Sequence, residues 1–288
     1  MNVDDMTARL SLRFGDGVAG WCAGVPGRAS ALAGRWGLVL GEPYGDGASS
    51  VAIRAATADG VAAVLKLTPD EAFLGEQVEM LRSLAPSGRV VRVLAAEAGA
   101  VLVEAVVPGT EADASPAEWA ELMAALHAVP PPPGLKRTLR GRMEEAFARI
   151  SRRLSEPAIA AHVDRDVWGL AVRRCERLLD STSTEVLLHG DLHPGNVLDG
   201  GARGLIAIDP KTCVGDPCFD AMDYVVDVAG KGSIEERCTQ VATAYGLDPD
   251  RLRTWSQVDA PLLAIGHLTW GGPVRAVEEL LAFAASGQ

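Results

Sequence analysis

The stretch His189-Gly190-Asp191-Leu192-His193-Pro194-Gly195-Asn196 decides how we interpret the fold of this chain. An apolar run, Leu205-Ile206-Ala207-Ile208, follows it and ends at Asp209. Phosphoryl transfer requires a carboxylate that orients the acceptor hydroxyl and oxygen ligands that hold Mg²⁺. Asp191 and Asn196 are five residues apart, and Asp209 follows thirteen residues later. This spacing of residue types predicts a phosphoryl-transfer site.

The same stretch is expected to be a loop between two short strands, at 185–188 and 196–199. Gly190, Pro194 and Gly195 disfavour a helix, and loops held by rigid strands often carry catalytic groups. An ordinary turn is the alternative, because Asp and Asn are common turn residues. A metal site built from His189 and His193 would require a helix, which the Pro-Gly sequence excludes.

The composition limits the classes of partner. The chain has 288 residues, of which 48% are hydrophobic, so one large domain or two closely packed domains are expected. Lys plus Arg total 27 and Asp plus Glu total 38, which gives a net charge of −11. Such a surface repels nucleic acid and anionic membranes and attracts cationic molecules.

Cysteine usage and hydropathy predict a location. The five cysteines are odd in number and form no Cys-x-x-Cys pair, so a disulfide framework or a zinc site is not expected. We find no signal peptide and no apolar run of membrane-spanning length. The sequence therefore predicts a cytoplasmic protein.

Strand patterns begin after residue 36, and we assign no chemistry to the residues before it. Loop Gly41–Ser50 separates an apolar strand from the alternating strand Val51–Ala55. The turn Asp59-Gly60 leads into the returning strand Val61–Leu67, which carries a lysine, Lys66. Small residues at a loop tip allow backbone N–H groups to approach phosphates, although an ordinary hairpin has the same pattern. The loop residues that we propose for this role are Gly45, Gly47 and Ser49.

A helix is predicted over Asp70–Ala85, because its apolar residues recur on one face. Glu76 and Glu79 lie one turn apart on this helix, and either could pair with a lysine; we favour Glu76. Two further strands are predicted at Val90–Leu94 and Ala100–Val107. The capping-box sequence Ser115-Pro116-Ala117-Glu118 predicts the start of the next helix.

Polar residues after residue 108 have open roles. Asp216 is expected to be a helix N-cap, and His127 a helix-terminal residue rather than a ligand. For Asp220, an exposed carboxylate in a first helical turn is one alternative. The last helices carry residues that could contact an acceptor or only pack, namely Trp255, Asp259, His267, Trp270, Glu278 and Glu279.

Two stretches of this sequence resemble motifs of the aminoglycoside phosphotransferase family, whose members are relatives of the protein kinases. The catalytic motif is His189–Asn196, and the metal motif is Ile208-Asp209-Pro210. The sequence Gly215-Asp216-Pro217-Cys218-Phe219-Asp220 is similar to the branch of streptomycin 6-phosphotransferases and hydroxyurea kinases. The resemblance implies an α+β, two-lobed protein-kinase-like fold. Residues 1–107 would form a nucleotide-binding lobe with a five-stranded antiparallel sheet, and residues 108–288 a mostly helical catalytic lobe.

The resemblance also implies roles for single residues. Asp191 would orient the acceptor hydroxyl, and Asp220 would accept hydrogen bonds that brace the catalytic loop near His189. We therefore group His189 and Asp220 with Asp191 as catalytic residues. Mg²⁺ would be held by Asn196 and Asp209. In the nucleotide site, Lys66 would hold phosphates with Glu76 as its partner. Backbone groups of the segment that contains Glu104 and Val106 would recognise the purine of ATP or GTP.

The expected function is ATP- or GTP-dependent O-phosphorylation that inactivates a small-molecule antibiotic. Acceptors implied by the resemblance are an aminoglycoside such as streptomycin, hydroxyurea, or a nucleoside or peptide natural product. A metabolic kinase acting on choline, homoserine or a sugar is an alternative, and a nucleotide-binding pseudokinase another. Gly190 in place of an arginine before Asp191 argues against a regulated protein kinase. We expect a monomer or a weak dimer.

Overall fold

An antiparallel five-stranded sheet forms early in the chain in the computed structural model, which describes residues 2–45, 47, 49–227 and 229–287. The strand order is β1-β2-β3-β5-β4, and every neighbouring pair is antiparallel. The predicted sheet is therefore confirmed. Its strands are β1 (Leu38–Pro43), β2 (Val51–Thr57), β3 (Ala62–Leu67), β4 (Val93–Glu97) and β5 (Ala100–Glu104).

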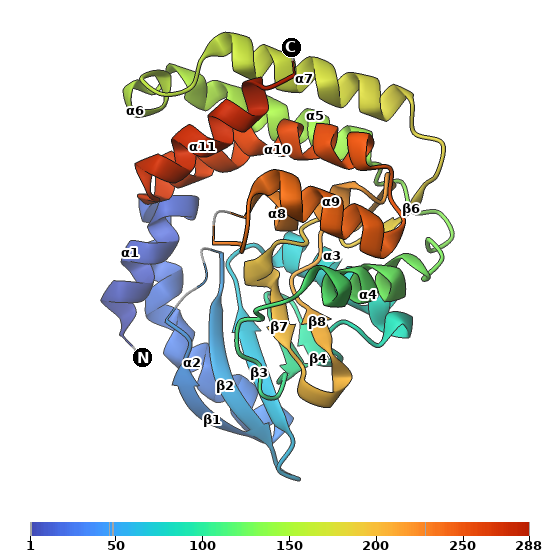
Figure 1. Cartoon of the computed structure of the whole chain (residues 1–288). Coiled ribbons are helices and arrows are strands. Elements are labelled where there is room, and N and C mark those ends of the chain that lie inside the picture. The colour runs from blue at the N-terminus through green and yellow to red at the C-terminus, as the bar shows by residue number, and fades with distance from the viewer. Residues whose placement is uncertain (1, 46, 48, 228, 288) are drawn as a thin grey trace. The chain divides into compact units, whose positions relative to one another are not determined.

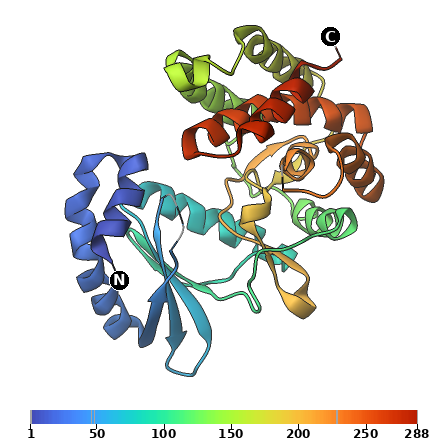
Figure 2. The same cartoon turned by 60° about the vertical axis from the view of Figure 1, so that its left-hand side comes forward.

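The two faces of this sheet pack against different helices, which are α1 (Val3–Phe14), α2 (Ala19–Trp36) and α3 (Glu71–Leu84). Side chains alternate between the faces of a strand. On β3, Ala63, Leu65 and Leu67 point to the core that α1 and α2 share with the sheet. On β5, Val101 faces the opposite way and packs with Leu74 and Val78 of α3. The helices α1 and α2 lie side by side in Figures 1 and 2.

The chain divides into two compact units. The N-terminal unit consists of Met1–Ala85 and Val90–Thr110, and the C-terminal unit of Pro86–Arg89 and Glu111–Gln288. The division into a nucleotide-binding lobe, 1–107, and a catalytic lobe, 108–288, stays a prediction. Two residues of the predicted phosphate loop, Asp46 and Ala48, lie outside the described residues.

Helices dominate the C-terminal unit, as predicted. They are α4 (Pro116–His127), α5 (Leu139–Ser151), α6 (Pro157–Ala160), α7 (Arg165–Asp180), α8 (Phe219–Val226), α9 (Ile234–Tyr245), α10 (Pro249–Trp270) and α11 (Val274–Ala285). Helix α10 is central, because it packs against α7, α8, α9 and α11 (Figure 1). The predicted capping box is present at α4, where Ser115 and Glu118 bond each other's backbone N–H.

Two short ribbons carry the motif stretch. Strand β6 (Val186–Leu188) pairs with β9 (Cys213–Gly215), and β7 (Val197–Asp199) pairs with β8 (Leu205–Ala207). The loop His189–Asn196 therefore joins strands of two different ribbons. Each end of the loop is fixed by a ladder of backbone hydrogen bonds.

Three sequence predictions are wrong in detail. Strand β5 ends at Glu104 rather than Val107. Strand β4 covers Val93–Glu97 rather than Val90–Leu94, and Val90 and Val91 are buried residues that precede it. Asp216 is not an N-cap, since α8 begins at Phe219 and its N-cap position is Cys218. Asp216 instead accepts hydrogen bonds from the Cys218 N–H at 3.0 Å and from Trp255 Nε1 at 2.7 Å.

In the part of the chain that the structure describes, every helix is too short or too polar to cross a membrane.

The sheet core yields a stability prediction. Leu65 is fully buried on β3, whereas Val39 on β1 is 70% exposed. Leu65→Ala should lower the free energy of unfolding by about 2–5 kcal/mol, because it removes packed methyl groups and leaves a cavity. Val39→Ala is the matched control and should change it by less than about 0.5 kcal/mol. Urea denaturation measures both; equal effects would mean that Leu65 is not a core residue.

Candidate active site

The loop between β6 and β7 turns sharply at Pro194–Asn196, which forms a single 3₁₀ turn. The Asn196 N–H donates to the His193 carbonyl oxygen at 2.8 Å. Asp191 therefore lies on irregular backbone and not on a helix. This loop conformation requires a separate source of rigidity, because it makes few backbone hydrogen bonds of its own.

Asp220 supplies that rigidity. Its carboxylate accepts the His189 N–H at 2.7 Å and the Gly190 N–H at 2.9 Å, one on each oxygen. Asp220 is fully buried, so the alternative of an exposed first-turn carboxylate is excluded. Burial alone would raise the pKa of Asp220, but hydrogen bonding and charge from His127, with smaller contributions from the loop, lower it. The carboxylate is therefore ionised and fixes two consecutive residues of the loop.

His127, at the end of α4, supports Asp220 from the other side. His127 Nε2 lies 3.0 Å from Asp220 Oδ2, and Nδ1 lies 2.7 Å from the Tyr245 hydroxyl oxygen. An ionised carboxylate can only accept, so Nε2 carries the proton and Nδ1 can accept from Tyr245. His127 does end its helix, as expected, but it also binds the group that holds the loop.

Two cations hold the Asp191 carboxylate. Arg142 of α5 donates to Oδ1 at 3.2 Å, and Lys211 Nζ lies 2.7 Å from Oδ2. Burial would raise the pKa of Asp191, but the charges of Lys211 and Arg142 outweigh it and lower that pKa. Asp191 is therefore a carboxylate at neutral pH, with a fixed orientation. The sequence pattern did not predict either cation as its partner.

His189 has a fully buried side chain. Its Nδ1 accepts the Asp191 N–H at 3.4 Å, and burial lowers its pKa. The side chain is therefore a neutral imidazole that orders the loop from within. Among the described residues, no side chain or backbone group hydrogen bonds to its buried Nε2.

The two predicted metal ligands lie at the same end of the β7–β8 ribbon. Asn196 precedes β7 and Asp209 follows β8, and the Ile208 N–H donates to the Asn196 carbonyl oxygen at 2.9 Å. The Asn196 amide nitrogen donates to the Asp191 carbonyl oxygen at 2.9 Å, which leaves the amide oxygen as an acceptor. Asp209 has φ of 56°, a left-handed conformation that Asp tolerates better than most residues. An amide and a carboxylate oxygen form a donor set that suits Mg²⁺.

In the N-terminal unit, Lys66 lies on the face of β3 that α3 covers. Its Nζ donates to Gln77 Oε1 at 3.1 Å, and Gln77 is buried on α3. Glu79 forms an ion pair with Arg82 at 2.6 Å. The choice of Glu76 as the partner of Lys66 stays a prediction.

The predicted phosphate loop makes contacts with distant segments. The Ser49 carbonyl oxygen accepts from Thr68 Oγ1 at 2.8 Å, and the Ser50 carbonyl oxygen accepts from Arg9 of α1 at 3.2 Å. Gly47 has φ of 102°, a conformation that favours glycine, and the space around the Gly45 Cα is open. The contact with Arg9 gives the N-terminal helix a role at this loop that the sequence did not indicate.

The segment predicted to recognise the purine begins at Glu104, the last residue of β5. Glu104 is buried and accepts from Arg92 Nε at 2.6 Å, so its side chain serves the structure of the N-terminal unit. Val106 is partly buried, and its carbonyl oxygen lies against Gly109, which has φ of 69°. The role of this segment in nucleotide binding stays a prediction.

The C-terminal residues that we listed as possible acceptor contacts differ in how deeply they are buried. Trp255 is fully buried and donates to Asp216, so it is a core residue, whereas Trp270 is 58% exposed. Asp259 is buried on α10 and belongs to a cluster with Asp223, Arg142 and Asp191. The expectation that Asp259 could contact an acceptor stays a prediction.

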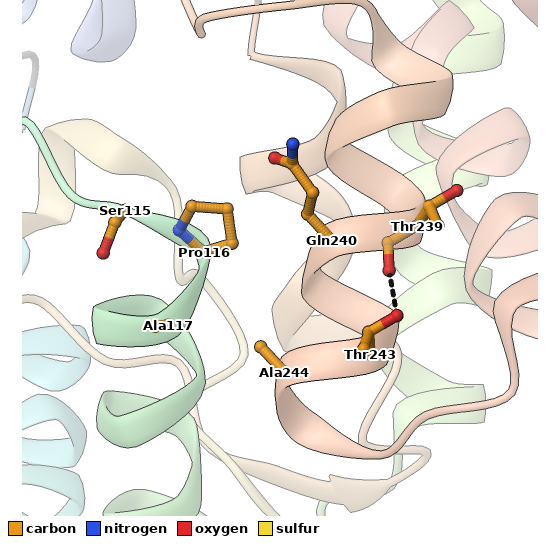
Figure 3. A pocket seen from close by; sticks show the side chains of 7 residues that line it. All are labelled: Ser115, Pro116, Ala117, Thr239, Gln240, Thr243 and Ala244. Carbon is orange, nitrogen blue, oxygen red and sulfur yellow. Dashed lines mark hydrogen bonds between the residues drawn. The ribbon is translucent and has the colours of Figure 1, made fainter.

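A pocket of the C-terminal unit opens between the start of α4 and α9 (Figure 3). It is lined by Ser115, Pro116, Ala117, Thr239, Gln240, Thr243 and Ala244. The Thr243 hydroxyl donates to the Thr239 carbonyl oxygen at 2.8 Å and so serves its own helix. None of the predicted site residues lines this pocket, and we assign no acceptor site to it.

The buried network around Asp220 predicts a pH-dependent loss of stability. Asp220→Asn should lower the free energy of unfolding by about 2–4 kcal/mol at pH 7, because one loop N–H loses its charged acceptor. The folded pKa of Asp220 is lowered, so its stabilisation is present above the unfolded pKa near 4 and is lost as pH falls through the folded pKa. The difference between wild type and variant should therefore narrow below about pH 4.

Urea denaturation between pH 3 and 8 measures this difference, in a range chosen around the usual carboxyl pKa. Asp180→Asn is the control, because that side chain is 73% exposed in its pair with Arg140. A cost for Asp220→Asn no larger than that of the control would show that the loop does not depend on this carboxylate.

Comparison with known proteins identifies the family. Residues 35–268 match the family described as aminoglycoside/hydroxyurea antibiotic resistance kinase. A hydroxyurea phosphotransferase of Kitasatospora aureofaciens is 34% identical over 263 residues, which cover 86% of this chain and 74% of that protein. A streptomycin 6-kinase of Streptomyces glaucescens is 30% identical over 274 residues, with coverage of 88% and 86%.

Solved structures agree in fold. The choline kinase LicA from Streptococcus pneumoniae superposes with a TM-score of 0.65 at 15% identity, over 90% of this chain and 97% of that one. This likeness shows a protein-kinase-like fold and nothing about the substrate. The chain belongs to the aminoglycoside/hydroxyurea antibiotic resistance kinase family and is a phosphotransferase that acts on an alcohol group.

Proposed function

We propose that this protein transfers the γ-phosphoryl group of ATP or GTP to a hydroxyl of a small-molecule antibiotic and so inactivates it. The geometry of Asp191 carries the proposal. Its carboxylate is held on one oxygen by Arg142 and on the other by Lys211, on a loop that Asp220 fixes. Few structural roles would require a carboxylate with two cations on a braced loop.

Asp191 would act as the acceptor-orienting base. Its lowered pKa keeps it ionised at neutral pH, so one of its lone pairs can accept a hydrogen bond from the acceptor hydroxyl. The proton moves to Asp191 as the oxygen–phosphorus bond forms, when the oxygen becomes a stronger acid. Lys211, 2.7 Å from the carboxylate, then lies beside the transferred charge.

The remaining parts would bind the phosphate donor. Asn196 and Asp209 would hold Mg²⁺, which when bound neutralises charge on the phosphates. Lys66, kept in place by Gln77, would bind α- and β-phosphate oxygens. Backbone N–H groups near Gly45, Gly47 and Ser49 would approach the phosphates.

An antibiotic acceptor follows from the relatives that we compared, a hydroxyurea phosphotransferase and a streptomycin 6-kinase. The choline kinase likeness, at 15% identity, gives no reason to prefer a metabolic acceptor. A pseudokinase is not favoured, because the chain has all four residues predicted to take part in phosphoryl transfer, namely Lys66, Asp191, Asn196 and Asp209. We propose a cytoplasmic location, which suits five free, buried cysteines.

Asp191→Asn should reduce kcat by about 10³-fold, because the neutral amide cannot take the acceptor proton. The Kd for nucleotide should stay unchanged, since Asp191 orients the acceptor. Steady-state kinetics on a panel of antibiotics and nucleotide titration measure the two constants. Bacteria that express the wild type should grow on one or more of these antibiotics, and bacteria with the variant should not. Wild-type kcat in the variant would refute the assignment of the base.

Gly190→Ala tests the loop geometry. Gly190 has φ of 80°, and a Cβ there would lie 2.2 Å from the Lys211 carbonyl oxygen. The variant must move the segment that carries Lys211 away from Asp191, so kcat/KM should fall about a hundredfold.

Gly134→Ala is the matched control for this variant. Gly134 has φ of 81°, but no heavy atom lies within 4 Å of a Cβ built there. It should lose about 1 kcal/mol of stability and keep its kcat/KM. Equal activity of the two alanine variants would show that the contact between Gly190 and Lys211 is not needed.

A further inference from the structure

The loop predicted to bind phosphates is held by two side chains from distant segments. Thr68, which follows β3, donates from Oγ1 to the Ser49 carbonyl oxygen at 2.8 Å. Arg9 of α1 donates from Nη1 to the Ser50 carbonyl oxygen at 3.2 Å. Both contacts lie within the N-terminal unit. Two consecutive carbonyl groups of the loop are therefore fixed by residues outside it.

These two bonds also orient backbone N–H groups. In a planar trans peptide unit, the C=O of one residue and the N–H of the next point in opposite directions. The bonds from Thr68 and Arg9 therefore set the directions of the Ser50 and Val51 N–H groups. A loop that binds phosphates does so through backbone N–H groups, so their directions decide how well they match phosphate oxygens. Arg9 thus acts on the short segment that carries the predicted phosphate contacts.

Helix α1 holds Arg9 in place against the sheet. Met6 and Leu10 of this helix are buried in the core that α1 and α2 share with the sheet. The same core contains Val51, the residue that directly follows Ser50. Arg9 precedes Leu10 and is itself partly buried. Its backbone is therefore already ordered, so the contact with the loop costs only the freedom of one side chain.

The guanidinium of Arg9 also brings a positive charge to the loop. Its Nη1 lies against Gly47 as well as Ser50, because a Cβ built on Gly47 would lie 3.4 Å from that atom. Gly47 is one of the residues predicted to approach the phosphates. A guanidinium carries a permanent charge, which attracts phosphate groups even without a direct contact. The contact and the charge both favour an anionic ligand at this loop.

We propose that Arg9 is a positioning residue of the nucleotide site, which orders the phosphate-binding loop from α1 and so raises the affinity for a nucleoside triphosphate. This inference rests on the proposed function, because that proposal assigns the loop to the phosphates of ATP or GTP. Arg9 lies before residues 35–268, the part of the chain that matches the family. The matched segment therefore does not include the residue that holds its loop.

A single substitution tests this role better than removal of α1. Leu10 is fully buried, so loss of the helix would open the sheet core and destabilise the whole unit. Arg9→Ala removes the guanidinium and should fold, because alanine has the highest helix propensity. Arg13→Ala is the matched control. Arg13 is an exposed residue of the same helix, one turn later, and its loss removes the same charge.

The main experiment measures the Kd of wild type and both variants of the full chain for ATP with Mg²⁺ and for adenosine. GTP and guanosine are tested in the same way. Arg9→Ala should raise the Kd for the triphosphate at least about tenfold, which corresponds to about 1.4 kcal/mol. Its Kd for the nucleoside should not change, because the nucleoside lacks the phosphates that the loop binds. Arg13→Ala should leave both constants as in wild type.

Two further measurements test positioning. In the nucleotide-free protein, the Ser50 and Val51 N–H groups should exchange with solvent faster in Arg9→Ala, because the carbonyl groups beside them lose an anchor. Arg13→Ala should leave these exchange rates unchanged. In steady-state kinetics, Arg9→Ala should raise the KM for the nucleotide, with kcat and the KM for the antibiotic nearly unchanged.

The outcomes separate Arg9 from the proposed function. Equal triphosphate affinity of wild type and Arg9→Ala would overturn the role of Arg9, as would an equal loss of affinity in Arg13→Ala. A parallel loss of nucleoside affinity would also overturn it, since the substitution would then distort the whole unit. Absence of product from every antibiotic would refute the proposed function, whereas the Kd values and exchange rates would still test Arg9.

Discussion

The hydrogen bonds from Asp220 to the backbone of His189 and Gly190 are the constraint on which the site depends. A carboxylate removed from water must be compensated by donors, and here two of them belong to consecutive residues of an irregular loop. Moving the loop would leave a buried charge without its donors. His127 and Tyr245 extend the network to α4 and α9, so that the position of Asp191 is set by the packing of helices.

The other half of the site is fixed by a ribbon. Pairing of β7 with β8 brings the ends of these strands together, and the bond from Ile208 to Asn196 continues the ladder to the last residue before Asp209. Asp209 then leaves the strand in a left-handed conformation. A position that costs backbone energy and is occupied by a non-glycine residue is typical of functional sites. Here the turn sends the chain on to Lys211, whose N–H donates to the His189 carbonyl oxygen at 2.8 Å.

Local patterns predicted much of this architecture, because they are set by neighbouring residues. Alternation along β2 and the turn Asp59-Gly60 indicated the first hairpin of the sheet, and the capping-box residues marked the start of α4. The error at Val90 has a local cause too, since buried valines before a strand resemble the strand itself. Gln77 was overlooked, although the helical period places it with the apolar residues of α3, where a polar side chain has to find a partner.

Contacts between residues that only tertiary packing brings together could not be predicted from the sequence. Arg142 and Asp191 are 49 positions apart and meet only because α5 lies against the motif ribbons. No periodicity in a single chain reports which helix faces touch, so these partners need the tertiary structure.

Asp259 shows how burial of a carboxyl group relates to stability. A group whose folded pKa is raised above its unfolded value near 4 destabilises the protein as pH rises toward that folded pKa, here about 6 for Asp259. At neutral pH the protein therefore carries an electrostatic cost at Asp259 of α10. A neutral residue at this position would remove that cost, as stabilising substitutions often do.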